Sequence, residues 1–165
     1  MIIVNVGDLL DKVKVGNILH GCNAQGVMGG GFALHVKNMY PVAYTEYRQR
    51  YESRGLTCGV SYKVDISPTL KVWNMISQEY YGIKHEKFEY ELLKSCFSDF
   101  LYKLDNDLPI HMPLIGCGLA KGKINIAIPI ICDMINDAKL NAYVWVLNET
   151  LAEEVKSCLR GISNV

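Results

Sequence analysis

The chain has 165 residues, of which 17 are lysine or arginine and 17 are aspartate or glutamate, so its formal net charge is zero. Half of the residues are hydrophobic and 21% are charged, a composition that excludes an extensively disordered chain. A balanced charge also argues against binding to long nucleic-acid duplexes, so an anionic ligand must be held by local groups.

Six short runs predict the strands of a sheet. Most are apolar, contain β-branched or aromatic residues, and are bounded by turn residues. The runs cover residues 1–6, 16–22, 60–65, 70–76, 110–115 and 142–147. The run at 60–65 alternates between polar and apolar residues, so we expect it to be a less buried edge strand.

Helical patterns lie between these strands. They cover about 31–39, 41–54, 87–105, 124–137 and 149–160. Pro41 occupies a favoured first helical position, and Asn148 is a suitable N-cap for the last helix. Strands that alternate with helices predict an α/β fold, a three-layer α/β/α sandwich around a mixed, mostly parallel sheet. No linker or repeat interrupts residues 1–165, so we expect a single domain.

The lengths of the apolar runs and the spacing of the cysteines predict a cytoplasmic protein without a metal or a cofactor. Asp8 interrupts the apolar start of the chain, and no run approaches the roughly 18 apolar residues that span a bilayer. No pair of cysteines has metal-ligand spacing with the histidines. We therefore expect free thiols at all six cysteines, which are Cys22, Cys58, Cys96, Cys117, Cys132 and Cys158.

Two glycine-rich connections join a predicted strand to a predicted helix. The first lies in "HGCNAQGVMGGGFALHVKNMYP" (20–41), and the second is "PLIGCGLAKGK" (113–123). Neither matches a P-loop or a dinucleotide fingerprint. Glycine at the carboxyl end of a parallel strand lets backbone N–H groups approach a ligand, although tight turns alone are an alternative explanation.

These stretches, together with "NMISQEYYG" (74–82), resemble the macro domain, an α/β/α module that binds ADP-ribose. The resemblance extends from "VNVGDLL" to "VWVL" and so covers nearly the whole chain. It implies that the glycine loops hold the diphosphate and the ribose through backbone N–H groups, without net positive charge. The stretches "HGCNAQGVMGGGFA" and "IGCGLA" are most similar to the branch of the family that contains ADP-ribose-1″-phosphate phosphatases and terminal ADP-ribose protein glycohydrolases.

The resemblance also implies roles for individual residues. Asp8, which precedes Leu9 in the "GDL" motif, would accept the adenine amine, although it is also placed to cap a short helix. Asn23 would contact the distal ribose, with an Asx turn as the alternative. Tyr81, or its neighbour Tyr80, would border the adenosine, with core packing as the alternative. The loop residues expected at the ligand are Gly29, Gly30, Gly31, Phe32, Gly116, Cys117, Gly118, Leu119, Ala120 and Gly122.

The glycohydrolase chemistry of the family is expected to be absent. It would need a lysine on the central strand and an aspartate after the "GCGL" motif. Those positions hold Gln78 and Ala120, neither of which can attack a sugar carbon or transfer a proton. Lys84 and Lys121 occupy different places relative to the motifs.

His20 is the candidate catalytic group, because phosphatase-like members carry a histidine at this place before the ligand asparagine. Together with Asn23 it would position substrate and water, whereas a structural histidine in the core is the alternative. We favour removal of the terminal phosphate from ADP-ribose-1″-phosphate. A non-catalytic ADP-ribose reader, or a weak ADP-ribosyl or O-acetyl-ADP-ribose hydrolase, remains the alternative. The expected partners are these nucleotides and ADP-ribosylated macromolecules, with neither duplex nucleic acid nor a membrane.

Overall fold

The strands and helices follow the order that the sequence predicts. The structure is a computed structural model that describes residues 1–82 and 88–162. In chain order the elements are β1 (Ile2–Val6), α1 (Leu9–Lys12), β2 (Gly16–Asn23), α2 (Gly31–Met39), α3 (Pro41–Arg54), β3 (Ser61–Ser67), β4 (Leu70–Gln78), α4 (Tyr90–Lys103), β5 (Ile110–Met112), α5 (Ile124–Asp137), β6 (Ala142–Val146) and α6 (Glu149–Ile162).

The strands form one mixed sheet in the order β1-β6-β5-β2-β4-β3. Strand β3 runs antiparallel to β4, and the other neighbouring strands run parallel. The buried residues of β2 and β4 explain why these two strands lie inside the sheet: Ile18, Leu19, Val72 and Trp73 are all fully buried. The carboxyl ends of the neighbouring strands β2 and β5 therefore meet at the same edge of the sheet.

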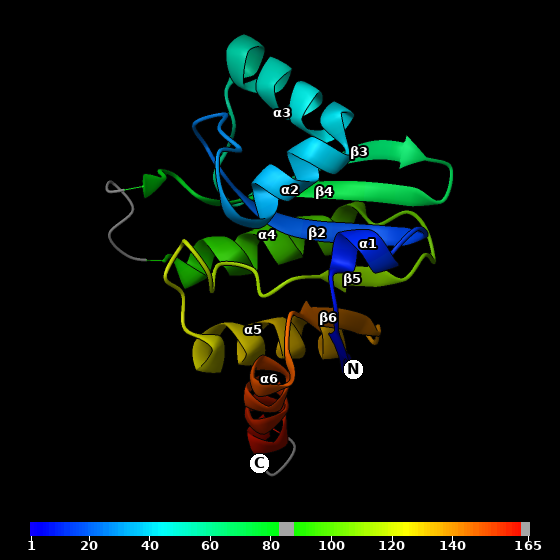
Figure 1. The fold of residues 1–165 in the computed structure, drawn as a ribbon. Coiled ribbons are helices and arrows are strands. Elements are labelled where there is room, and N and C mark those ends of the chain that lie inside the picture. Colours follow the sequence, from blue (N-terminus) through cyan, green and yellow to red (C-terminus); the bar gives the residue numbers. More distant parts are fainter. Residues whose placement is uncertain (83–87, 163–165) are drawn as a thin grey trace.

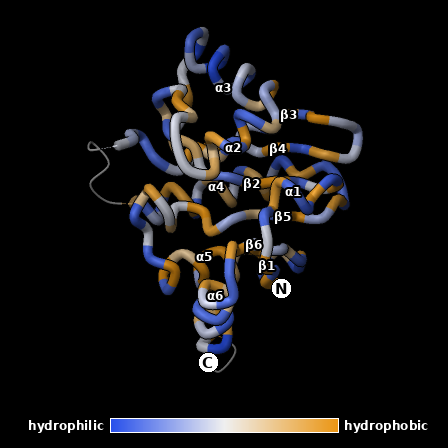
Figure 2. The backbone as a smooth tube through the Cα atoms, viewed as in Figure 1, coloured by the Kyte–Doolittle hydropathy of each residue, from blue (hydrophilic) through white to orange (hydrophobic). Residues whose placement is uncertain are grey.

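Helices cover both faces of this sheet, which gives the predicted three-layer sandwich (Figure 1). Helices α4, α5 and α6 enclose the larger hydrophobic cluster, whereas α1, α2 and α3 cover two smaller clusters on the opposite face. Figure 2 shows hydrophobic residues along the inner strands and on α5. The inward stripe of α5 includes Ala127, Ile128, Ile131 and Ile135, a spacing that puts these side chains on one side of a helix.

Several boundaries differ from the prediction by one to three residues, and three of them bear on the site. Strand β5 ends at Met112 instead of 115, because Pro113 has no N–H to continue the ladder. Strand β4 continues to Gln78, which pairs with Asn23 of β2. The helix that was expected from residue 87 begins at Tyr90, and residue 87 itself lies outside the described residues.

Two further predictions concern the cysteines and the edge strand. All six cysteines are free thiols, as predicted, and three of them are buried. Strand β3 lies at the edge of the sheet, also as predicted, although Ser61 and Val64 are buried beneath neighbouring helices. Among the helices of residues 1–82 and 88–162, none combines the length and the apolar character needed to cross a bilayer.

Candidate functional site

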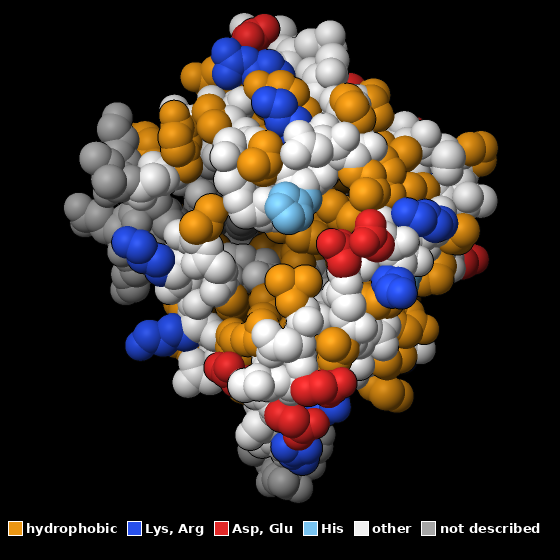
Figure 3. Space-filling view, viewed as in Figure 1, with side chains coloured by type: hydrophobic (Ala, Val, Ile, Leu, Met, Phe, Trp, Pro, Cys, Tyr) orange, Lys and Arg blue, Asp and Glu red, His pale blue; other side chains and the backbone are white. Residues whose placement is uncertain are grey.

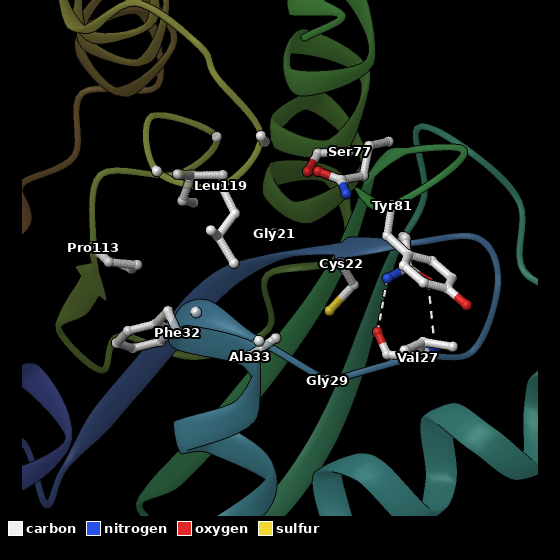
Figure 4. Close-up of a pocket in the computed structure, with 18 of the residues that line it drawn as sticks. Gly21, Cys22, Val27, Gly29, Phe32, Ala33, Ser77, Tyr81, Pro113 and Leu119 are labelled. Carbon is white, nitrogen blue, oxygen red and sulfur yellow. Dashed lines mark hydrogen bonds between the residues drawn. The ribbon is translucent and has the colours of Figure 1, made fainter. Parts of the chain in front are cut away.

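A cleft of about 670 Å³ opens at the carboxyl ends of β2, β4 and β5. Its walls are the loop from Asn23 to α2 on one side and the loop from Pro113 to α5 on the other (Figure 4). Figure 3 shows hydrophobic side chains and uncharged surface around the hollow on this side of the molecule, with acidic side chains at one margin and a histidine at another. Parallel packing of β2 against β5 brings the two loops together, although they are about 90 residues apart in sequence.

The first loop is held in shape by the side chain of Asn23. Its Oδ1 accepts hydrogen bonds from the backbone N–H of Gln25 at 3.0 Å and of Val27 at 3.3 Å, and its Nδ2 donates to the Val27 carbonyl at 2.7 Å (Figure 4). The buried Tyr47 hydroxyl lies 3.0 Å from the same Oδ1. Asn23 therefore forms the Asx turn that was considered for it, and it also lines the cleft.

The amino end of α2 faces the cleft without a side-chain cap. Gly30 is the N-cap residue and makes no side-chain hydrogen bond, whereas the N-terminus of α1 is capped by Asp8. The first N–H groups of a helix have no intrahelical partner, and the helix dipole gives this end a partial positive charge. The first N–H groups of α2, on Gly31, Phe32 and Ala33, belong to residues that line the cleft and thus form a surface suited to an anion.

Five glycines of the two loops fall into two groups. Gly31 and Gly116 have φ values of +58° and +77°, a backbone conformation that favours glycine. Gly29, Gly30 and Gly118 do not have positive φ. A Cβ at Gly118 would have open space, and one at Gly29 would make an ordinary van der Waals contact with a neighbouring side chain. A Cβ at Gly30 would meet only the flexible end of Leu119. The fold therefore does not require glycine at Gly29, Gly30 and Gly118, which leave backbone bare towards the cleft.

The second loop lies against two aromatic side chains from the amino end of α4 and the residues before it. A Cβ on Gly116 would approach the Phe88 ring to 2.2 Å, so the loop backbone lies directly on this buried ring. The Tyr90 hydroxyl accepts a hydrogen bond from the Lys123 N–H at 2.9 Å, and the Gly122 N–H closes the loop on the Gly116 carbonyl at 2.7 Å. These contacts fix the loop conformation independently of any ligand.

Leu119 extends from the second loop across to the first. Its Cδ1 lies 3.1 Å from the position that a Cβ on Gly30 would occupy and 3.2 Å from the same position on Gly31. The side chain is nevertheless 75% exposed. Single exposed leucines are common on protein surfaces, so the exposure itself does not indicate a ligand, but Leu119 is placed to contact one bound between the loops.

Most of the predicted ligand residues lie together in the cleft, and some do not. The predicted residues that line it are Asn23, Gly29, Gly30, Gly31, Phe32, Tyr81, Gly116, Gly118, Leu119 and Ala120. The predicted residues that are not part of its lining are Asp8, Leu9, His20, Cys117 and Gly122. Gln78 and Ala120, which stand where the glycohydrolase lysine and aspartate would be, both line the cleft.

His20 does not have the position that a catalytic histidine needs. Its side chain is fully buried, it is absent from the cleft lining, and its Nε2 lies 2.6 Å from Oδ1 of the buried Asn74. Burial lowers the pKa of the imidazole from 6.5 to about 4, against the opposing effect of the Asn74 hydrogen bond. The structure therefore favours the core role that was the alternative for His20 over the direct acid–base role, because a fully buried ring that does not line the cleft makes no direct contact with a substrate.

Asp8 and Leu9 have structural roles at α1. Oδ1 of Asp8 accepts hydrogen bonds from the N–H of Leu10 at 2.9 Å and of Asp11 at 3.4 Å, which is the capping role considered for it. Leu9 is 2% exposed and belongs to the core under α1 and α2, so its side chain cannot contact a ligand. Asp8 itself is exposed and has a second carboxylate oxygen for another donor.

Of the two tyrosines, Tyr81 lines the cleft and Tyr80 does not. Figure 4 places Tyr81 near Val27 and away from Phe32, and Phe32 packs with the α1 residues that follow Asp8. The contact of Tyr81 with the adenosine stays a prediction, and Tyr81 lines the end of the cleft away from Phe32. Lys84 and His85 lie outside the described residues.

Sequence reasoning missed several residues of the floor, among them Gly21, Cys22 and Ser77. Gly21 and Cys22 adjoin Asn23 on β2, so they could have been suggested by proximity alone. Ser77 had no comparable signal, because a serine at the end of a buried strand is common and its surroundings depend on how β4 pairs with β2.

Comparison with known proteins is consistent with this geometry. The sequence model of the Macro domain family matches residues 19–131, a segment that includes both glycine loops. A curated protein from Aspergillus clavatus, named ADP-ribose 1″-phosphate phosphatase, is 48% identical over 42 residues. This segment is 26% of the present chain, and the chain spans only 21% of the length of that relative.

Solved structures resemble the chain over most of its length. A protein of unknown function from Bacteroides thetaiotaomicron is 30% identical, with a TM-score of 0.79 over 88% of this chain and 97% of that one. The Thermosipho africanus DarTG protein, solved in complex with ADP-ribose, is 16% identical with a TM-score of 0.74, over 90% of this chain and 42% of that one. The latter likeness concerns the fold alone.

Proposed function

The chain belongs to the macro domain family, and from this premise we propose that it binds ADP-ribose in the cleft between the two glycine loops. The observation that carries the proposal is the bare backbone at Gly29, Gly30 and Gly118, where the fold itself does not need glycine. A ligand that is recognised through backbone N–H groups requires such positions, because a side chain there would occupy its place.

The chemistry of the described lining suits a diphosphate and two sugars. The uncapped amino end of α2 offers N–H donors and a partial positive charge to an anion. Asn23 and Gln78 provide amide groups for hydroxyls, and Phe32, Leu119 and Ile115 provide apolar surface for a ribose and a base. In this arrangement the diphosphate lies between Gly30 and Gly118, with the distal ribose near Asn23.

The adenosine is assigned to the opposite end, towards α1. Phe32 belongs to the cluster that contains Leu9 and Leu10, and Asp8 precedes these residues. The carboxylate of Asp8 keeps Oδ1 on its capping bonds and offers its second oxygen to the adenine amine. A change at Asp8 should therefore affect the base and leave the diphosphate contacts intact.

A thermal-denaturation series tests the proposal. ADP-ribose at about 100 times its dissociation constant should stabilise the protein by about 2.7 kcal/mol, which raises the melting temperature by roughly 5–10 °C for a domain of this size. ADP should give a smaller shift, and ribose 5-phosphate a still smaller one, because each fills part of the cleft. Equal melting temperatures with and without ADP-ribose would contradict the proposal.

Hydrolysis of ADP-ribose-1″-phosphate is a second candidate, supported by the name of the 48% identical segment from Aspergillus clavatus. With His20 buried, any such activity would depend on a water held near Asn23 against the bound phosphate. The assay is phosphate release from ADP-ribose-1″-phosphate, with product identification by mass spectrometry. Tight binding without phosphate release would identify a reader, and turnover of O-acetyl-ADP-ribose or an ADP-ribosylated peptide would identify one of the other hydrolases.

A further inference from the structure

The hydroxyl of Ser77 is a buried polar group without a visible function in the fold. The residue is 1% exposed and lines the cleft, yet within the described part of the chain its Oγ has no hydrogen-bond partner. Buried hydroxyls in proteins are almost always paired, because an unpaired one loses its bonds to water without replacement. An unpaired hydroxyl at a cleft wall is therefore a candidate contact for a bound group.

The pairing of β4 with β2 turns Ser77 out of the regular ladder. Cys22 pairs with Ile76 and Asn23 pairs with Gln78, so Ser77 has no counterpart on β2. This one extra residue is a β-bulge, a feature that redirects a side chain and that occurs often beside functional sites. Here the bulge occurs at the carboxyl end of β4, next to the asparagine that shapes the first loop.

Gly21 lies directly against this hydroxyl and places no side chain beside it. A Cβ at Gly21 would lie 2.9 Å from Oγ of Ser77 and 3.2 Å from Cγ2 of Ile115, closer than ordinary contacts. Gly21 does not have a positive φ, so its backbone does not require glycine. The missing side chain thus serves the space around the Ser77 hydroxyl, which Figure 4 shows on the same side of the cleft as Tyr81.

A second buried serine shows what a purely structural hydroxyl does in the same sheet. Ser61 on β3 is also 1% exposed, and its Oγ donates a hydrogen bond to the Cys96 carbonyl at 2.8 Å. Both serines lie on strands and are equally buried, but only Ser61 satisfies its hydroxyl within the described chain. Ser77 and Ser61 therefore form a natural pair of test and control.

We propose that the Ser77 hydroxyl binds a hydroxyl of the terminal ribose of ADP-ribose, an inference that rests on the function proposed above. Ser77 adjoins Gln78, the pairing partner of Asn23, and lies away from Phe32 and Pro113 in Figure 4. It is thus at the end of the cleft opposite to α1, where the adenosine is assigned. A hydroxyl both donates and accepts, which suits a sugar hydroxyl. Ser77 is then one of the contacts that distinguish ADP-ribose from ADP.

The test compares Ser77→Ala with Ser61→Ala by calorimetric titration and thermal denaturation. Ser77→Ala should weaken ADP-ribose binding about tenfold, equivalent to about 1.4 kcal/mol, while the affinity for ADP changes less than twofold. Its melting temperature should not fall, because the hydroxyl that it loses has no partner in the fold. Ser61→Ala should show the reverse, with a lower melting temperature and unchanged binding of both nucleotides.

Two results would overturn the assignment, and they are distinguishable. If the parent binds ADP-ribose and Ser77→Ala binds it equally well, Ser77 does not contact the terminal ribose and the function proposed above still stands. If the parent binds neither nucleotide while it is folded, that function fails and the assignment fails with it. Gly21→Ala provides a second measurement, because its Cβ should weaken ADP-ribose binding by crowding the same hydroxyl. Unchanged binding by Gly21→Ala would also contradict the proposed contact.

Discussion

His20 and Asn74 form a hydrogen-bonded pair between β2 and β4, with Nε2 of the histidine 2.6 Å from Oδ1 of the asparagine. Asn74 in turn donates from Nδ2 to the Ala43 carbonyl at 3.1 Å, so its Oδ1 is the acceptor and His20 is the donor. Both side chains are fully buried. The pair connects the sheet to α3 beneath the cleft, and replacing His20 should therefore affect stability more than ligand binding.

The pH dependence of stability tests this role. The folded pKa of His20, about 4, lies below its unfolded value of 6.5, so the unfolded chain takes up the proton first as the pH falls. The contribution of neutral His20 to the free energy of unfolding is fully present above pH 6.5 and is lost progressively towards pH 4. The loss amounts to about 3 kcal/mol in total. His20→Gln keeps a donor without titrating, so urea denaturation should show a shallower decline over this range. An identical pH profile in parent and variant would contradict the assignment.

Charge placed in the second loop should abolish binding without unfolding the protein. Gly118 has open space around its Cβ position and no positive φ, so Gly118→Glu is tolerated by the fold. A carboxylate beside the diphosphate should weaken ADP-ribose binding by at least about 100-fold. Titration calorimetry measures the affinity, and a melting temperature close to that of the parent confirms that the variant is folded.

The contrasting variant is Gly116→Ala. Its φ is +77°, and the new Cβ would meet the Phe88 ring at 2.2 Å. We expect a loss of about 2 kcal/mol or more in the free energy of unfolding, measured by urea denaturation. A drop of similar size in Gly118→Glu would show that both glycines are needed for the turn, and that the backbone of the second loop is not kept bare for a ligand.

Leu119 should slow release of the ligand. Because it is 75% exposed and lies over Gly30 and Gly31, Leu119→Ala should leave stability unchanged and weaken ADP-ribose binding about three- to tenfold, mainly through faster dissociation. Leu147 is a matched control, since it is 74% exposed and does not line the cleft. Equal dissociation rates for the Leu119→Ala and Leu147→Ala variants would exclude a contact of Leu119 with the ligand.

Two substitutions separate the roles of Asp8. Asp8→Asn keeps an oxygen for the N–H groups of Leu10 and Asp11, but turns its NH₂ towards the adenine amine. It should retain the melting temperature and weaken ADP-ribose binding. Asp8→Ala should weaken ADP-ribose binding and also lower the melting temperature, because the missing cap costs about 1 kcal/mol in stability. If Asp8→Asn binds ADP-ribose as tightly as the parent does, the aspartate is a helix cap only.

The elements of the fold could be predicted because each is encoded locally. Apolar runs such as 16–22 and 142–147 are too short for helices, and Pro41 and Asn148 mark where helices begin. The two glycine loops could be placed in one cleft, because both follow parallel strands at the same edge of a sheet. Boundaries were less certain where pairing decides them, as at Gln78, which extends β4 by bonding to β2.

The chemistry of individual side chains could not be predicted, because it depends on partners far along the chain. His20 has a plausible catalytic position in sequence, but Asn74, which lies 54 residues away, binds its ring in the core. The support of Gly116 by Phe88 and the open hydroxyl of Ser77 are likewise products of packing and strand register. Residue type and spacing carry no information about these contacts.

Calorimetric titration of the parent protein with ADP-ribose shows whether the cleft is an ADP-ribose site. We expect one site per chain with a dissociation constant in the low micromolar range, equivalent to about −8 kcal/mol. The same titration with Gly118→Glu should show no saturable heat. If the parent protein melts cooperatively but gives no heat of binding with ADP-ribose at several temperatures, the cleft is not an ADP-ribose site.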